Sequence, residues 1–161
     1  MIFIISEITM HTLSNYENKF NLKKITNFRD KKIILDLNFS ANNIKSLIFK
    51  YAKNNVICVC GTSAHKIYKI KEILDKINIL ILNKQESLNL TKKKNIRIAL
   101  NEIIKKNRKL TIIITNGKNY VRSYHNKTLY HCKPPKIKII NENKAGDVMS
   151  AFFCYFFFKT N

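Results

Sequence analysis

The chain has 161 residues, of which 45% are hydrophobic, so it is long and apolar enough to form one domain with a buried core rather than a disordered segment. Thirty basic and ten acidic side chains give a net charge of +20, which would attract polyanions such as RNA. The excess is almost all Lys, spread along the chain without a nucleic-acid recognition motif, whereas Arg is scarce. Biased composition therefore explains the charge better than an RNA-binding surface, and we expect no nucleic-acid partner.

The apolar runs and the cysteines indicate a soluble protein of a reducing compartment. The apolar run at residues 151–158 is far shorter than the roughly 20 residues that span a bilayer, and no secretory signal is visible. Cys58 and Cys60 alternate within an expected strand and share one face, a spacing that by itself closes neither an unstrained disulfide nor a zinc site. We therefore expect free thiols, no membrane partner and a cytoplasmic location.

The first part of the chain alternates apolar strands with amphipathic helices. Strands are expected at 1–5, 32–37, 56–60 and 79–82. Helices are expected at 41–53, where Ser40 can cap the first turn, and at 65–77, where apolar residues recur at helical spacing. Residues 11–25 give a weaker signal for a helix or a loop.

The second part of the chain continues this alternation. We expect a short turn or helix at 84–90, a helix at 95–107, a strand at 110–115, short strands at 121–124, 129–132 and 137–140, and an apolar helix at 145–158. Strands that are apolar throughout must be covered on both faces, so the pattern predicts an α/β domain with a mostly parallel, Rossmann-like sheet and helices on both faces. We expect one partial domain over 1–161.

Polar residues follow three of these strands, at the edge where parallel sheets bind their ligands. Asn83 and Glu86 could offer an amide and a carboxylate to Mg²⁺, or they could form a capping box at the start of a helix. Thr115 and Gly117 could lie under a nucleotide or form a plain turn. Asp36 is the polar residue at the end of the third of these strands, which comes earlier in the chain.

Ala145, Gly146 and Asp147 begin the last expected helix. The unpaired backbone N–H groups of a helix N-terminus can hold a phosphate, and Gly146 would let the backbone approach it closely. An acid at this place could accept a proton from an attacking hydroxyl. From these residues alone, an ordinary capped helix whose first-turn acid interacts favourably with the helix dipole explains Asp147 better.

The order and spacing of these segments resemble the ribokinase-like (PfkB) family of carbohydrate and nucleoside kinases, from about residue 30 to the end. The resemblance is carried by Asp36-Leu-Asn38, Thr62-Ser63-Ala-His-Lys66, Asn83-Lys-Gln-Glu86, Thr115-Asn-Gly117 and Lys144-Ala-Gly-Asp147. Within the family, Asp36-Leu-Asn38-Phe-Ser40 and Thr62-Ser63 with Lys66 are most similar to the pseudouridine kinase group.

The resemblance implies a ribokinase-like fold that transfers the γ-phosphate of ATP to a sugar or nucleoside hydroxyl with the help of Mg²⁺. It implies that Asp147 is the catalytic base and that the backbone N–H groups of Ala145, Gly146 and Asp147 form an anion hole. It also implies that Thr115 and Gly117 line the ATP site. Asn83 and Glu86 would organise Mg²⁺ and its waters.

The chain departs from the family pattern in three ways. Lys144 and Tyr120 stand where the family has glycines, in its G-A-G-D and T-x-G-x-x-G motifs. The N-terminal half of the family fold, which supplies the lid sheet and most sugar contacts, has no counterpart in the sequence. We therefore expect a fold truncated at its N-terminal side, with a separate chain as one source of the missing half. A non-catalytic nucleotide-binding domain and a basic RNA-binding module are the alternatives.

Overall fold

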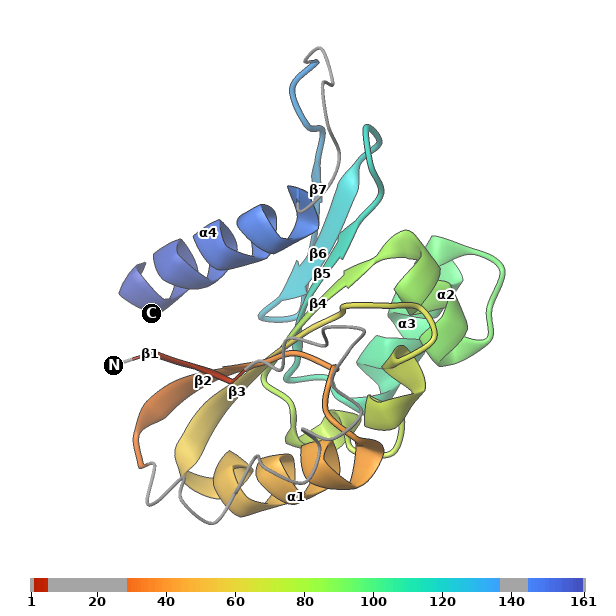
Figure 1. Ribbon diagram of the computed structural model, residues 1–161. Coiled ribbons are helices and arrows are strands. Elements are labelled where there is room, and N and C mark those ends of the chain that lie inside the picture. Colours follow the sequence, from red (N-terminus) through yellow and green to blue (C-terminus); the bar gives the residue numbers. More distant parts are fainter. Residues whose placement is uncertain (1, 6–28, 137–144, 161) are drawn as a thin grey trace, which may run out of the picture.

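The chain folds around one seven-stranded sheet, shown in Figure 1. The computed structural model describes residues 2–5, 29–136 and 145–160, and of residues 2–5 only the backbone. The strands are β1 (Ile2–Ile5), β2 (Lys31–Leu35), β3 (Asn55–Cys60), β4 (Ile79–Asn83), β5 (Thr111–Thr115), β6 (Val121–His125) and β7 (Thr128–Cys132). They lie in chain order, β1 to β5 parallel and β6 and β7 antiparallel, which confirms the mostly parallel sheet.

Helices cover both faces of the sheet. They are α1 (Ala41–Tyr51), α2 (Lys84–Thr91), α3 (Ile96–Lys106) and α4 (Ala145–Thr160), with short 3-10 helices at Ala52–Asn54, Ile67–Ile70 and Leu74–Lys76. Figure 1 shows α1, α2 and α3 on one side of the strands and α4 alone on the other. The expected three-layer arrangement is therefore confirmed.

Successive residues of β2 to β5 point into two separate cores. In β3, Ile57 and Val59 face the core under α1 to α3, whereas Cys58 faces the core under α4. In β5, Ile112 and Ile114 face the core under α1 to α3, and Ile113 faces the core under α4. This alternation explains why these strands are apolar at every position: each face of the sheet needs its own set of buried side chains.

Local polar residues set several element boundaries. The Ser40 hydroxyl accepts a hydrogen bond from the backbone N–H of Asn43 at 3.2 Å, which confirms the expected cap of α1. Strand β2 ends at Leu35, two residues before the expected end. The chain turns there because the backbone N–H of Asn38 donates a hydrogen bond of 3.0 Å to the Asp36 carboxylate. The β6–β7 hairpin turns through Asn126 and Lys127, both with positive φ, as in a type I′ turn.

The prediction of an α-helix at 65–77 is wrong. The segment forms two 3-10 helices instead, although its apolar residues Ile67, Ile70, Ile73, Leu74 and Ile77 are all buried as expected. A repeat of three residues keeps Ile67, Ile70 and Ile73 on one side of a 3-10 helix, so the spacing fits the tighter helix better than the wider one. The Lys69 ammonium donates to the backbone carbonyls of Leu37 and Phe39, which ties the segment to the chain after β2.

Some expectations lie outside the described residues, namely the segments at 11–25 and 137–140 and the position of Lys144. Among the described helices, none combines the length and the hydropathy needed to cross a bilayer.

Helix α3 offers a direct test of the buried core. Ile103→Ala should lower the free energy of unfolding by about 2–5 kcal/mol, because Ile103 is 0% exposed and its loss leaves a cavity. Ile98→Ala on the same helix is the matched control, since Ile98 is 51% exposed and should change stability by at most about 0.5 kcal/mol. Urea denaturation followed by circular dichroism measures both. Equal losses would contradict the described packing of α3.

Candidate functional site

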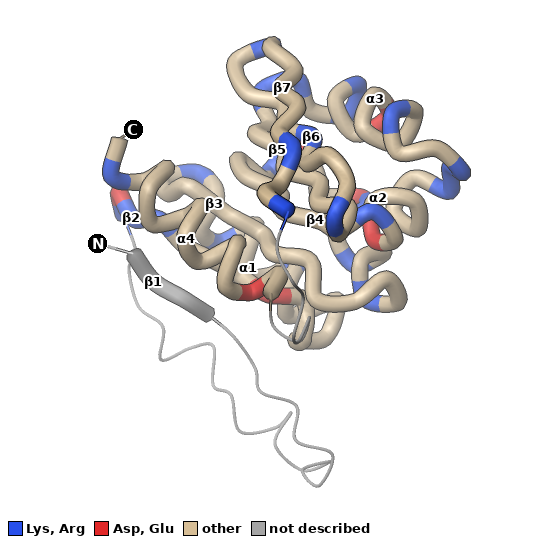
Figure 2. Tube along the Cα trace, turned by 90° about the horizontal axis from the view of Figure 1, so that it is seen from above, with Lys and Arg blue, Asp and Glu red and all other residues tan. Residues whose placement is uncertain are grey.

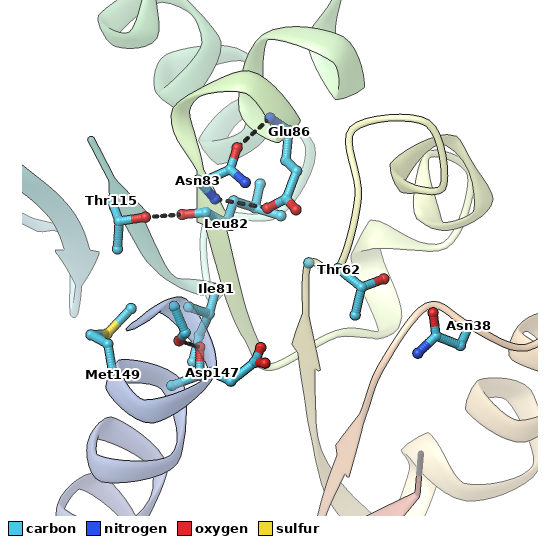
Figure 3. A pocket seen from close by; sticks show the side chains of 12 residues that line it. Asn38, Thr62, Ile81, Leu82, Asn83, Glu86, Thr115, Asp147 and Met149 are labelled. Atoms are coloured by element: carbon cyan, nitrogen blue, oxygen red, sulfur yellow. Dashed lines mark hydrogen bonds between the residues drawn. The ribbon is translucent and has the colours of Figure 1, made fainter. Parts of the chain in front are cut away.

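A cavity of about 400 Å³ lies at the carboxyl ends of β3, β4 and β5, beside the first turn of α4. Figure 3 shows the side chains around it, which come from the ends of strands and from the starts of α2 and α4. Five of the seven residues with an expected role in the site line this cavity: Asn83, Glu86, Thr115, Gly146 and Asp147. Residues far apart in the sequence are thus brought to one edge of the sheet, where α/β folds bind their ligands.

The sheet register places Asn83 beside Thr115. The two residues end β4 and β5 and are direct partners in the parallel ladder. The Thr115 hydroxyl donates a long hydrogen bond of 3.4 Å to the backbone carbonyl of Leu82, so it is only weakly engaged within the protein. Both side chains therefore belong to the same rim of the cavity.

Asn83 and Glu86 form a capping box at the start of α2. The Asn83 amide oxygen accepts from the backbone N–H of Glu86 at 2.9 Å, and the Glu86 carboxylate accepts from the backbone N–H of Asn83 at 2.8 Å. This confirms the capping interpretation of the N-x-x-E segment. The box also orients the Glu86 side chain, which is only 2% exposed, along the wall of the cavity.

Burial raises the pKa of Glu86, and the hydrogen bond from the Asn83 backbone N–H partly opposes this effect. Gly61, directly after β3, makes room for the carboxylate. A Cβ atom at Gly61 would lie 2.2 Å from Glu86 Oε2, so any larger residue would have to displace the carboxylate. Gly61 was not among the expected site residues, although a glycine directly after an apolar strand, in a chain with only three glycines, is a signal that could have identified it.

The first turn of α4 borders the cavity from the other face of the sheet. Gly146 and Asp147 line the cavity, and a Cβ atom at Gly146 would meet nothing within 4 Å. Figure 3 shows the Asp147 side chain in the space between β4 and the segment that carries Thr62. The helix N-terminus thus directs its partial positive charge towards this space, beside the Asp147 carboxylate.

Two residues of the expected site do not line the cavity. Ala145 is the first residue of α4 and is exposed. Gly117 lies in the turn after β5 with φ of 54°, where its lack of a side chain is required by the backbone, and no described atom lies within 4 Å of a Cβ placed there. Tyr120, which follows the same turn, is exposed.

A chain of hydrogen bonds joins Asp36, Asn38 and Lys66 near the cavity, which Asn38 lines. The Lys66 ammonium donates to the Asn38 amide oxygen at 2.8 Å, and the Asn38 amide nitrogen donates to the Asp36 carboxylate at 2.9 Å. The segment Asp36-Leu-Asn38 and the segment that contains Lys66 are therefore in direct contact.

The cavity lining is acidic. Glu86 and Asp147 contribute carboxylates, and no Lys or Arg stands among the described lining residues. A polyphosphate would meet these carboxylates unless a cation neutralised them. The described residues contain no group of three or more His, Cys, Asp or Glu side chains that could hold a metal by themselves. Oxygen ligands of this kind suit Mg²⁺ that keeps several waters and binds substrate phosphates.

Glu86→Gln tests the cost of the buried carboxylate. Glutamine at this position keeps the capping box, because its amide oxygen can accept from the Asn83 backbone N–H. Since the pKa of Glu86 is raised in the folded state, the wild-type chain should lose stability as the pH rises through that pKa, and the variant should not. The stability of Glu86→Gln relative to wild type should therefore increase between about pH 4 and about pH 7 in urea titrations.

Glu102→Gln is the matched control. The Lys105 ammonium, 3.0 Å away, lowers the pKa of the exposed Glu102 carboxyl. This variant should therefore lose a little stability relative to wild type over the same pH range. If the two variants show the same trend, the burial of the Glu86 carboxylate does not control its titration.

The comparisons with known proteins agree with this geometry. The profile of the pfkB family carbohydrate kinases matches residues 7–160. No curated protein shows significant sequence similarity to the chain.

Solved kinases share the fold at low sequence identity. Phosphofructokinase-2 from Escherichia coli in complex with fructose-6-phosphate has a TM-score of 0.67 and 15% identity, over 92% of this chain and 50% of that one. Adenosine kinase from Anopheles gambiae has a TM-score of 0.68 and 16% identity, over 80% of this chain and 45% of that one. Adenosine kinase from Sinorhizobium meliloti has a TM-score of 0.63 and 14% identity, over 78% of this chain and 42% of that one.

At such identities the likeness shows the ribokinase-like fold, and the chain spans half or less of the length of these enzymes. The family match extends over nearly the whole sequence, from residue 7 to residue 160, and includes every segment around the cavity. The chain therefore belongs to the pfkB family of carbohydrate kinases.

Proposed function

We propose that this chain forms the nucleotide-binding part of an ATP-dependent phosphotransferase that acts on a sugar or nucleoside hydroxyl. The observation that carries the proposal is the placing of Asp147, in the first turn of α4, in the same cavity as Glu86 and Thr115. A helix N-terminus for phosphate, a carboxylate for a proton and oxygen ligands for a cation are the parts that phosphoryl transfer needs.

Asp147 is the catalytic base in this proposal. Its carboxylate accepts the proton of the acceptor hydroxyl as the hydroxyl oxygen attacks the γ-phosphorus of ATP. The bond between the γ-phosphorus and the bridging oxygen breaks, and ADP leaves. The backbone N–H groups of Ala145, Gly146 and Asp147 stabilise the charge that develops on the phosphoryl oxygens.

The remaining residues bind the nucleotide and the cation. Thr115 can donate its weakly engaged hydroxyl to a phosphate, and Gly117 lets the backbone turn without a side chain beside the nucleotide. Glu86, oriented by Asn83, would hold Mg²⁺ through its waters, and the cation when bound neutralises the ATP phosphates against the two carboxylates.

The acceptor that fits the proposal best is pseudouridine. The support is the contact between Lys66 and Asn38, which joins the two segments that resemble the pseudouridine kinase group. Free cysteines among the described residues are compatible with a reducing compartment, so the proposal includes a cytoplasmic location.

We further propose that the acceptor site needs the rest of the kinase fold, whether it belongs to the same polypeptide or to another. The solved relatives are at least twice as long as the region that matches this chain. In addition, α4 leaves Val148, Phe152, Tyr155 and Phe156 more than half exposed on one side, although the helix is apolar all round. A helix of this composition is normally buried on all sides.

The cation dependence of ATP binding tests the nucleotide site. Isothermal titration of the purified chain should show at least about tenfold weaker ATP binding in EDTA than in Mg²⁺, because the unneutralised phosphates would face Glu86 and Asp147. Adenosine, which carries no phosphate, is the control ligand and should bind equally in both buffers. Equal ATP affinities in EDTA and in Mg²⁺ would contradict the proposed roles of the two carboxylates.

Catalysis is tested separately from binding. These 161 residues alone should phosphorylate pseudouridine or ribose at little more than the background rate, because the proposed acceptor site needs the rest of the kinase fold. In a protein that contains the rest of the fold, Asp147→Asn should lower the rate by about 10²–10⁴ and leave ATP affinity nearly unchanged. Asp75→Asn, at a surface ion pair with Lys76, is the control. Efficient turnover by the 161 residues alone, lost in Asp147→Asn, would overturn the need for the rest of the fold.

The RNA-binding alternative finds little support in the distribution of charge. Figure 2 shows Lys and Arg near both edges of the sheet and along α2 and α3 rather than gathered in one patch. Filter binding at two salt concentrations distinguishes the two functions, since an RNA-binding module would lose affinity steeply with salt.

A further inference from the structure

Three cysteines meet where α4 packs on the sheet. Cys58 and Cys60 lie on the same face of β3, and Cys154 lies opposite them on α4. The Sγ atoms of Cys58 and Cys154 are 3.6 Å apart, and both side chains are buried. These two residues are 96 positions apart in the sequence, so only the packing of α4 brings them together.

This thiol cluster lies directly beneath the cavity. Cys60, which is only partly buried, is followed by Gly61 in the cavity lining. On α4, Ser150 lines the cavity and lies one helical turn before Cys154. The cluster therefore adjoins the cavity lining on both β3 and α4.

The three thiols also differ in acidity. Hydrogen bonds from the thiols of Cys58 and Cys60 lower the pKa of Cys154, whereas these contacts and burial raise the pKa of Cys58. Because the thiolate is the nucleophilic form, Cys154 is the sulfur that should react first.

We propose that Cys58 and Cys154 form a reversible disulfide that ties α4 to β3. The sulfur atoms need to approach by about 1.5 Å to reach a disulfide bond length. Among the described residues, α4 is held to the sheet by side-chain packing and by the Lys32 ammonium, which donates to the Phe158 carbonyl. A covalent bond at Cys154 would therefore restrict the helix that carries Gly146 and Asp147 into the cavity.

The oxidant in this proposal is a hydroperoxide, and the reaction balances in two steps. The Cys154 thiolate attacks one peroxide oxygen, the O–O bond breaks, and Cys154 becomes a sulfenic acid while hydroxide or alkoxide leaves and is protonated. The Cys58 sulfur then attacks the Cys154 sulfur, and hydroxide leaves and combines with the Cys58 proton as water. Two thiols are oxidised by two electrons, and hydrogen peroxide is reduced to two waters.

The test uses the full chain with Cys132→Ser, since Cys132 is exposed on β7 and could link two molecules. Hydrogen peroxide should remove two hydrogen atoms from the monomer, as measured by intact mass, and dithiothreitol should restore them. Trypsin should release a linked pair of peptides, 54–66 and 145–159. The oxidised chain should melt roughly 5–15 °C higher than the reduced chain, because the bond closes a long loop.

Peptide 54–66 contains both Cys58 and Cys60, so two further variants assign the bond. Cys60→Ser should keep the linked peptides, and Cys58→Ser should lose them. Fragmentation of the linked peptides from the Cys132→Ser chain separates Cys58 from Cys60 without a core substitution, in case Cys58→Ser does not fold. The absence of a linked peptide after oxidation, or a bond that fragmentation assigns to Cys60, would overturn the proposal.

Discussion

Both faces of the parallel strands must be covered, and the rest of the structure depends on this requirement. Every position of β4, from Ile79 to Leu82, carries a buried apolar side chain, so neither side of the strand can face water. Helices α1 to α3 satisfy one face, and α4 satisfies the other. Because α4 also carries Asp147, the packing that completes the core is the same packing that brings an acid to the cavity.

The cavity uses groups that also stabilise the fold. The capping box between Asn83 and Glu86 satisfies backbone N–H groups at the start of α2, and it holds a buried carboxylate in the wall of the cavity. Gly61 is small because this carboxylate lies against it. Substitutions here therefore act on stability and on the site together.

The local charge of the site is opposite to that of the whole chain. The sequence carries a net charge of +20, whereas two carboxylates and no described Lys or Arg line the cavity. Long-range attraction can thus concentrate a nucleotide near the protein, but close contact with its phosphates needs a cation. Under the proposed function, Mg²⁺ is required for binding as well as for catalysis.

The sequence by itself determined the local features of the structure, which depend on residues that are neighbours in the chain. The strands, the cap at Ser40 and the capping box at Asn83 and Glu86 follow from hydrogen bonds and side-chain periodicity within a few positions. Tertiary structure decided the rest. The sheet register brought Asn83 beside Thr115, and the position of α4 brought Cys154 to Cys58. Such contacts join residues tens of positions apart, and no local pattern specifies them.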